Sequence, residues 1–113
     1  MARAEARLGA VAGVGASYTI VGPAAPTVFN LNIHLTNVTG AAIKVRVFLA
    51  DNSWTTGEPT GASLKARIAY DESIAANGLL QISGVIMLAT EKLVVYSDTA
   101  SSLDVIASGV QVS

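Results

Sequence analysis

Two stretches of alternating residues decide the fold: Val28-Phe29-Asn30-Leu31-Asn32-Ile33-His34-Leu35-Thr36 and Ile43-Lys44-Val45-Arg46-Val47-Phe48-Leu49. In each stretch every second residue is apolar, and the residues between them are mostly polar or charged. A period of two is typical of a strand with one buried face, because successive side chains leave a strand on opposite sides. The linker, residues 37–42, is polar at its start and contains a glycine. We therefore expect the two strands to form an antiparallel hairpin.

Similar strand signals recur along the rest of the chain, separated by turn residues, at residues 18–21, 65–70, 79–88, 92–97 and 103–107. Within one of them, Gly84 indicates a bulge or a close backbone approach. About seven or eight strands without a convincing helix predict an all-β protein, an antiparallel β-sandwich or jelly-roll-like single domain over residues 17–113. We expect its core to contain Phe29, Leu31, Ile33, Val45, Val47, Ile68, Ile82, Ile86, Leu93 and Val95.

The first sixteen residues differ from the rest of the chain. Glu5 and Arg7 interrupt their start, and residues 8–16 are short and broken by glycine, which is unlike the apolar region of a signal peptide. The glycines also disfavour a stable helix. We expect residues 1–16 to form a flexible N-terminal arm that becomes ordered on a partner, with Leu8, Val11 and Val14 as its apolar contacts.

Composition restricts the possible partners. The chain has 113 residues, 51% of them apolar and only 13% charged, against about 25% charged in an ordinary soluble protein. Seven dispersed basic residues and a net charge of −1 give no footprint for nucleic acid. No run approaches the ~18 apolar residues of a membrane-spanning helix, and cysteine is absent.

The low charge suggests that other protein copies cover part of the surface. We expect a homo-oligomer, with a trimer as the first candidate, or a lattice-bound state. A monomer with a surface rich in Ser, Thr and Asn is the alternative.

No motif predicts catalysis, a metal site or a cofactor. His34 is the only histidine, it lies mid-strand, and no serine has the G-x-S-x-G context of a nucleophile. The acidic residues match no EF-hand spacing, and no glycine-rich loop opens a helix to hold phosphate. A carboxylate pair for glycoside hydrolysis stays open as an alternative, although no spacing selects one.

Trp54 is the only tryptophan and lies in a polar loop. One interpretation is that it stacks on a sugar ring, which would make the chain a carbohydrate-binding module. The other is that it anchors the loop onto its own domain or into a neighbouring subunit. Aromatic residues total only 5%, which favours the second interpretation, so we include Trp54 among the candidate interaction residues.

The order of several segments along the chain resembles that of a known group of proteins. In the first half they are Ser17-Tyr18-Thr19-Ile20-Val21, Thr36-Asn37 and Ile43-Lys44-Val45-Arg46-Val47. In the second half they are Ile68-Ala69-Tyr70-Asp71, Ile74-Ala75-Ala76-Asn77-Gly78-Leu79-Leu80, Ser83-Gly84-Val85-Ile86-Met87-Leu88, Glu91-Lys92-Leu93-Val94-Val95-Tyr96-Ser97 and Leu103-Asp104-Val105-Ile106-Ala107-Ser108-Gly109. Over residues 8–109 this order resembles small virion structural proteins of tailed bacteriophages. The loop at residues 54–62 is longer than in that family.

The resemblance implies a β-sandwich that assembles on capsids, necks or tails. It implies a non-enzymatic virion protein, assembled in the host cytoplasm, with a capsid decoration or cement role first and a neck, tail or baseplate accessory role second. Its partners would be the major capsid protein or neck and tail proteins. It would bind them through its sheet surface, strand edges and N-terminal arm.

Overall fold

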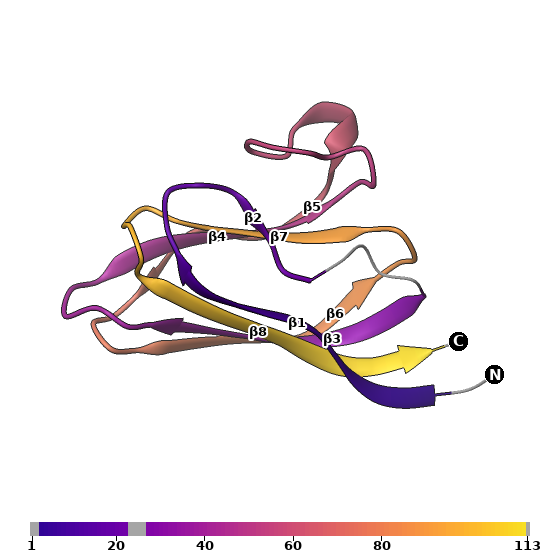
Figure 1. The fold of residues 1–113 in the computed structure, drawn as a ribbon, viewed down its shortest axis with the longest axis horizontal. Helices are drawn as coiled ribbons and strands as arrows, with labels where there is room; N and C mark the ends of the chain where they lie inside the picture. The colour runs from indigo at the N-terminus through magenta and orange to yellow at the C-terminus, as the bar shows by residue number, and fades with distance from the viewer. Residues whose placement is uncertain (1–2, 23–26, 113) are drawn as a thin grey trace.

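The computed structural model describes residues 3–22 and 27–112, which form two antiparallel four-stranded sheets packed face to face (Figure 1). The strands are β1 (Arg3–Val14), β2 (Thr19–Ile20), β3 (Val28–Asn37), β4 (Ile43–Ala50), β5 (Leu64–Ile74), β6 (Leu79–Met87), β7 (Lys92–Ser97) and β8 (Leu103–Val112). A single 3-10 turn, η1 (Gly61–Ser63), precedes β5. The described residues include no helix with the length and apolar character needed to cross a membrane.

The strands are paired in a nested order. The first sheet has the order β1-β8-β3-β6, and the second sheet has the order β2-β7-β4-β5. Strand β1 therefore pairs with β8, β2 with β7, β3 with β6 and β4 with β5, all antiparallel. A long hairpin wound around itself gives this order, which is that of a jelly roll. The predicted all-β sandwich is confirmed.

The predicted hairpin between residues 28–36 and 43–49 is wrong. Strand β3 lies in the first sheet and β4 in the second, and residues 38–42 cross from one sheet to the other. A period of two shows which face of a strand is buried, but it does not show whether the next strand lies beside that strand or opposite it. In this fold the two strands lie opposite one another across the core.

The core lies between the two sheets. Seven of the predicted core residues are at most 3% exposed, namely Phe29, Leu31, Ile33, Val45, Val47, Leu93 and Val95. Ile68 and Ile82 are only half-buried and pack against this cluster from its margin. Ile86 is 53% exposed, so its predicted place in the core is wrong.

The exposure of Ile86 follows from the bulge at Gly84. Gly84 has a φ of +75°, in the left-handed region that favours glycine. At this point the register between β3 and β6 shifts, and the inward positions of β6 change from Ile82 to Val85. Two residues instead of one separate these inward positions, so Ile86 points to solvent.

The N-terminal segment is a strand of the sandwich, so the expected flexible arm over residues 1–16 and the domain boundary at residue 17 are wrong. Strand β1 pairs with β8 from Arg3 opposite Val112 to Val14 opposite Leu103. Residues 1–2 lie outside the described residues. Glycine in this segment serves close packing: a Cβ on Gly9 would lie 2.6 Å from backbone atoms of Gly22.

Asn37 connects the two crossovers at one end of the sandwich. Its side chain is fully buried. Its Nδ2 donates hydrogen bonds to the carbonyl oxygens of Ala41, Ile74 and Ala75 at 2.8–3.1 Å, and its Oδ1 accepts from the backbone N–H and the hydroxyl of Thr39 at 2.9 and 2.8 Å. The turn after β3 and the turn between β5 and β6 are therefore held by one amide.

Replacing Asn37 by alanine should destabilise the fold strongly. The substitution leaves buried carbonyl and N–H groups without their partner, and we expect the free energy of unfolding to fall by more than about 2 kcal/mol. Asn30→Ala, at an exposed position of the same strand, should change it by less than about 1 kcal/mol. Chemical denaturation of both variants measures the difference, and similar losses would contradict this role for the Asn37 amide.

Removing residues 1–14 should also destabilise the fold. The deletion takes away the strand that covers the edge of β8, together with the buried side chains of Leu8 and Val14. We expect the unfolding midpoint to fall by more than about 10 °C, followed by circular dichroism. Ala10→Ser, at an exposed position of β1, is the control; a truncated chain that melts like the full chain would mean that β1 is a dispensable arm after all.

Candidate functional site

The outer face of the first sheet carries little charge over β3, β6 and β8, in which Asp104 is the one acidic or basic residue. Cross-strand neighbours in an antiparallel pair lie on the same face, and the register places outward residues of β6 and β8 beside those of β3. We call this surface the neutral face and define it by Asn30, Asn32, His34, Thr36, Leu79, Gln81, Ile86, Ile106, Ser108 and Val110. Two charged residues border it. Asp104 pairs with Thr36, and its Oδ1 accepts a hydrogen bond of 2.9 Å from the backbone N–H of Gly13. Arg7 of β1 pairs with Ser108.

Large apolar side chains are exposed on the neutral face. Leu79 is 58% exposed, Ile86 53% and Ile106 43%. Asparagine, glutamine, serine and threonine stand between them and offer hydrogen bonds without a full charge to desolvate. The neutral face thus shares one feature with protein-binding surfaces, in which charged residues are depleted at the centre.

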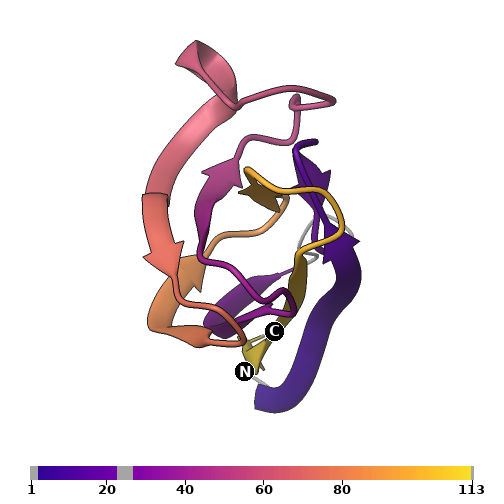
Figure 2. The same cartoon turned by 90° about the vertical axis from the view of Figure 1, so that its left-hand side faces the viewer.

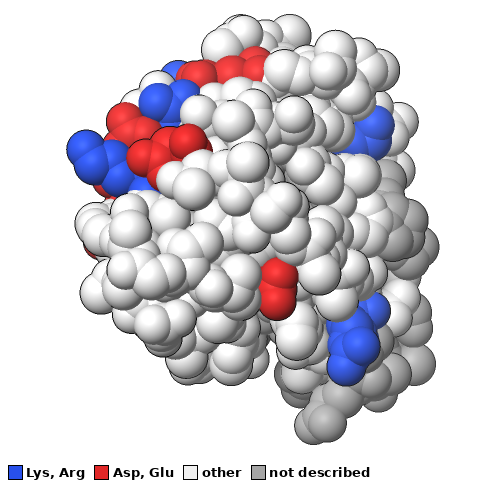
Figure 3. All heavy atoms as spheres, turned by 60° about the vertical axis from the view of Figure 1, so that its left-hand side comes forward, with Lys and Arg blue, Asp and Glu red and all other residues white. Residues whose placement is uncertain are grey.

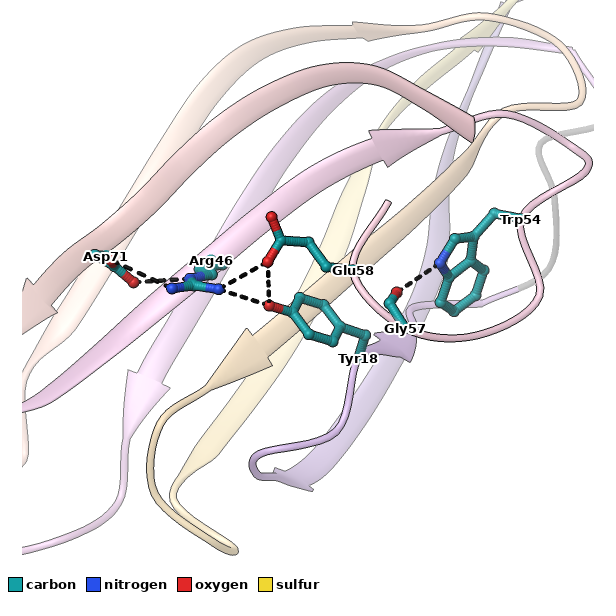
Figure 4. Close-up of polar contacts among 6 residues, drawn as sticks. All are labelled: Tyr18, Arg46, Trp54, Gly57, Glu58 and Asp71. Carbon is teal, nitrogen blue, oxygen red and sulfur yellow. Dashed lines mark hydrogen bonds and ion pairs between the residues drawn. The ribbon is translucent and has the colours of Figure 1, made fainter. Parts of the chain in front are cut away.

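The opposite outer face, on the second sheet, contains a cluster centred on Arg46 (Figure 4). The Arg46 Nε donates to Asp71 Oδ1 at 2.8 Å, and its Nη1 donates to the Tyr18 hydroxyl at 2.7 Å and to Glu58 Oε1 at 3.0 Å. The Tyr18 hydroxyl in turn donates to Glu58 at 3.0 Å. The guanidinium lies 4.3 Å from the centroid of the Tyr70 ring, within the range of a cation–π contact.

A bulge in β5 places two of these groups. Val45 pairs with Glu72 and Val47 with Ala69, so two residues of β5, Tyr70 and Asp71, stand opposite Arg46. Asp71 adopts a φ of +54° there, a conformation that aspartate tolerates better than most residues. The bulge brings both the Tyr70 ring and the Asp71 carboxylate to the guanidinium of Arg46. The sequence contains no pattern that predicts this bulge.

The Arg46 cluster shifts the titration of its members. The hydrogen bond that Arg46 donates to Asp71 holds the pKa of Asp71 below its usual value and raises the pKa of Arg46. Burial raises the pKa of Tyr18. Because these groups satisfy one another, the Arg46 cluster holds β2 and the loop of residues 51–63 on the second sheet instead of presenting an open binding site. Figure 3 shows a group of charged side chains at the upper left and separate charged side chains elsewhere, with most of the visible surface uncharged.

Trp54 anchors that same loop onto its own domain. It is 6% exposed and lies in a small core with Phe48, Ala50 and Val94. Its Nε1 donates to the carbonyl oxygen of Gly57 at 2.8 Å (Figure 4). The interpretation that Trp54 anchors the loop onto its own domain is therefore confirmed. The buried indole has no open face for a sugar ring or a partner, so its inclusion among the candidate interaction residues is wrong.

The other predicted interaction residues do not form a surface either. Leu8 and Val14 are 6% and 3% exposed and belong to the main core, and Val11 is half-buried against it. Leu79, Ile86 and Ile106 were not identified from the sequence as exposed interaction candidates, and Ile86 was placed in the core. Each of them lies opposite an outward-facing residue of β3, and this position can be recognised only when the register of the strands is known.

The described residues include no group of three or more His, Cys, Asp or Glu side chains placed to hold a metal ion. His34 lies on the neutral face with Gln81 and Ile106 as its cross-strand neighbours. Neither neighbour is a carboxylate or a nucleophile, so the pairing of His34 does not form a catalytic triad.

Comparison with known proteins gives no relative: no family model matches the chain, and no curated protein is similar to it.

The Arg46–Asp71 contact predicts a pH dependence of stability. The pKa of Asp71 is lower in the folded state, so its stabilisation is present above the ordinary value of about 3.9 and is lost as the pH falls through the folded-state pKa. We expect Asp71→Asn to reduce the loss of stability between about pH 5 and pH 2, measured by denaturant unfolding. In an Arg46→Gln background the same substitution should have little effect; an equal effect in both backgrounds would contradict this origin.

Proposed function

We propose that this chain is a non-enzymatic structural protein of a bacteriophage virion, and that it attaches to other virion proteins through the neutral face. The observation that carries the proposal is the neutral face itself, a sheet surface with exposed Leu79, Ile86 and Ile106 whose nearest charges, Asp104 and Arg7, lie at its border. Such a surface gains free energy when a partner removes its apolar area from water.

The two outer faces of the sandwich suit a protein bound on one side. The Arg46 cluster and the Trp54 loop cover the second sheet, whereas no loop of the described chain covers the neutral face in this way. A particle-bound protein needs one surface that binds and another that faces water. The jelly roll recurs among viral capsid proteins, and this likeness is an analogy of fold that supports the proposal without carrying it.

Within the virion, a capsid decoration or cement role is our first proposal. A small single domain with one adhesive face can occupy many equivalent places on a shell, bound to the major capsid protein. A neck, tail or baseplate accessory role uses the same surface and is the second proposal. The carbohydrate-binding alternative rested on Trp54, and the burial of that side chain removes its support.

The proposal is tested on purified particles of the phage that encodes the chain. Mass spectrometry gives the copy number, and particles lacking the protein are then titrated with recombinant chain. We expect saturable binding, and the double variant Asn32→Lys/Ile106→Lys should bind at least about 10-fold more weakly, because two new charges must be desolvated at the interface.

Thr55→Lys/Thr56→Lys is the matched control, since it adds the same charge at exposed positions of the loop on the opposite face. It should bind like the unmodified chain. Absence of the protein from particles, or an equal loss of binding in both double variants, would refute attachment through the neutral face.

A further inference from the structure

An open hollow of about 260 Å³ lies between β1 and β8 of the first sheet. The residues that line it are Ala10, Val11, Ala12, Asp104, Val105 and Ile106. Ile106 is also part of the neutral face, so the hollow adjoins that face. The hollow is smaller than the about 300–1,000 Å³ of small-molecule sites, and its size suits one long side chain.

A bulge in β1 fixes the carboxylate of Asp104 at this hollow. Two residues of β1, Ala12 and Gly13, stand opposite Asp104 alone. Gly13 has a φ of +71°, in the left-handed region that favours glycine, and its N–H donates to Asp104 Oδ1 at 2.9 Å. No hydrogen bond or ion pair among the described residues engages Oδ2. The carboxylate is therefore held by one oxygen, and the other is open to a partner.

Asp104 needs a positive charge when a partner covers the neutral face. No other Asp, Glu, Lys or Arg occurs in β3, β6 or β8, and Arg7 pairs with Ser108, four positions farther along β8. A partner that covers Ile106 also removes water from the hollow that Ile106 shares with Asp104. Loss of water from an unpaired carboxylate is strongly unfavourable, so a partner that fits this surface supplies a cation there.

We propose that the hollow receives a lysine side chain of the virion protein that binds the neutral face. The proposal rests on the attachment proposed above and names the chemistry of the partner at one point of the interface. The four-carbon stem of the lysine lies along Ala10, Ala12 and Ile106, and its ammonium meets Oδ2 of Asp104. Arginine suits the hollow less well, because it binds a carboxylate best through two parallel N–H bonds to both oxygens, and Oδ1 already accepts from Gly13.

The test uses purified particles that lack the protein. Their lysines are either acetylated, which removes the charge, or reductively methylated, which keeps it. The unmodified chain should bind acetylated particles at least about 10-fold more weakly than methylated particles. The variant Asp104→Asn should bind both kinds of particle equally, because the charge that the lysine would meet is gone. An equal loss for the unmodified chain and for Asp104→Asn, or no loss for either, would overturn the proposal.

Variants of the chain separate the carboxylate from the shape of the hollow. Asp104→Asn keeps an oxygen to accept from Gly13, so its unfolding midpoint should match that of the unmodified chain, while its binding to untreated particles falls at least about 10-fold. Ala12→Leu, at an exposed position, fills the hollow and should also weaken binding. Glu72→Gln is the control, since it removes the same charge at an exposed position of β5, which lies on the opposite side of the molecule from β1 (Figure 2). Full binding by both Asp104→Asn and Ala12→Leu would contradict a lysine in the hollow.

Carbodiimide cross-linking of the bound chain identifies the partner directly. It should join Asp104 to a lysine of one particle protein by an amide bond, which mass spectrometry of the linked peptides locates; cross-links from other carboxylates alone would refute the contact. If Asn32→Lys/Ile106→Lys loses binding while Asp104→Asn binds fully, attachment through the neutral face holds and only the lysine contact falls. If the unmodified chain does not bind the particles, both proposals fall.

Discussion

The apolar faces of β3 and β4 meet across the sandwich, and the position of every other strand depends on this contact. Strand β3 pairs with β6 and β8, and β4 pairs with β5 and β7. Strands β1 and β2 are then added next to β8 and β7. Burial of one apolar face by the other is thus the main source of stability, and the outer strands extend it. Half-buried side chains occur where this extension ends, along β5 and β6.

The contact between the two apolar faces determines the layers, but it does not determine how the chain crosses from one sheet to the other. Asn37 stabilises two of these crossovers. In sequence it reads as the end of a polar turn, and it also begins the Asn37-Val38-Thr39 match to a glycosylation acceptor. In the fold its amide is fully buried and uses both of its ends on backbone groups of two turns. An amide in this state is not accessible for modification, and the crossover from β3 to β4 depends on it.

The sequence predicts the strands well because each prediction rests on local alternation. It predicts the neighbours of those strands poorly, because nested pairing joins residues as far apart as Arg3 and Val112, and no local pattern encodes such a pair. The same limit explains the interaction residues. Leu8 was predicted to contact a partner because glycines follow it in the sequence, yet glycine at position 9 permits close packing within the fold. Trp54 was predicted to contact a partner because polar residues surround it, yet the polar loop folds over the indole. Ile86 was predicted to be buried from the alternation of residues 79–88, and the bulge at Gly84 turns its side chain to solvent.

The distribution of side chains between the two outer faces makes the molecule directional. All three tyrosines and the single tryptophan lie in the Arg46 cluster or in the small core beside it. The second sheet therefore satisfies its own large polar and aromatic groups, which leaves little free energy to be gained by a partner there. The first sheet carries short amides, hydroxyls and exposed isoleucine and leucine, whose apolar area stays in water in the isolated chain. The proposed attachment through the neutral face rests on this asymmetry, because apolar area remains to be removed from water on that side of the molecule.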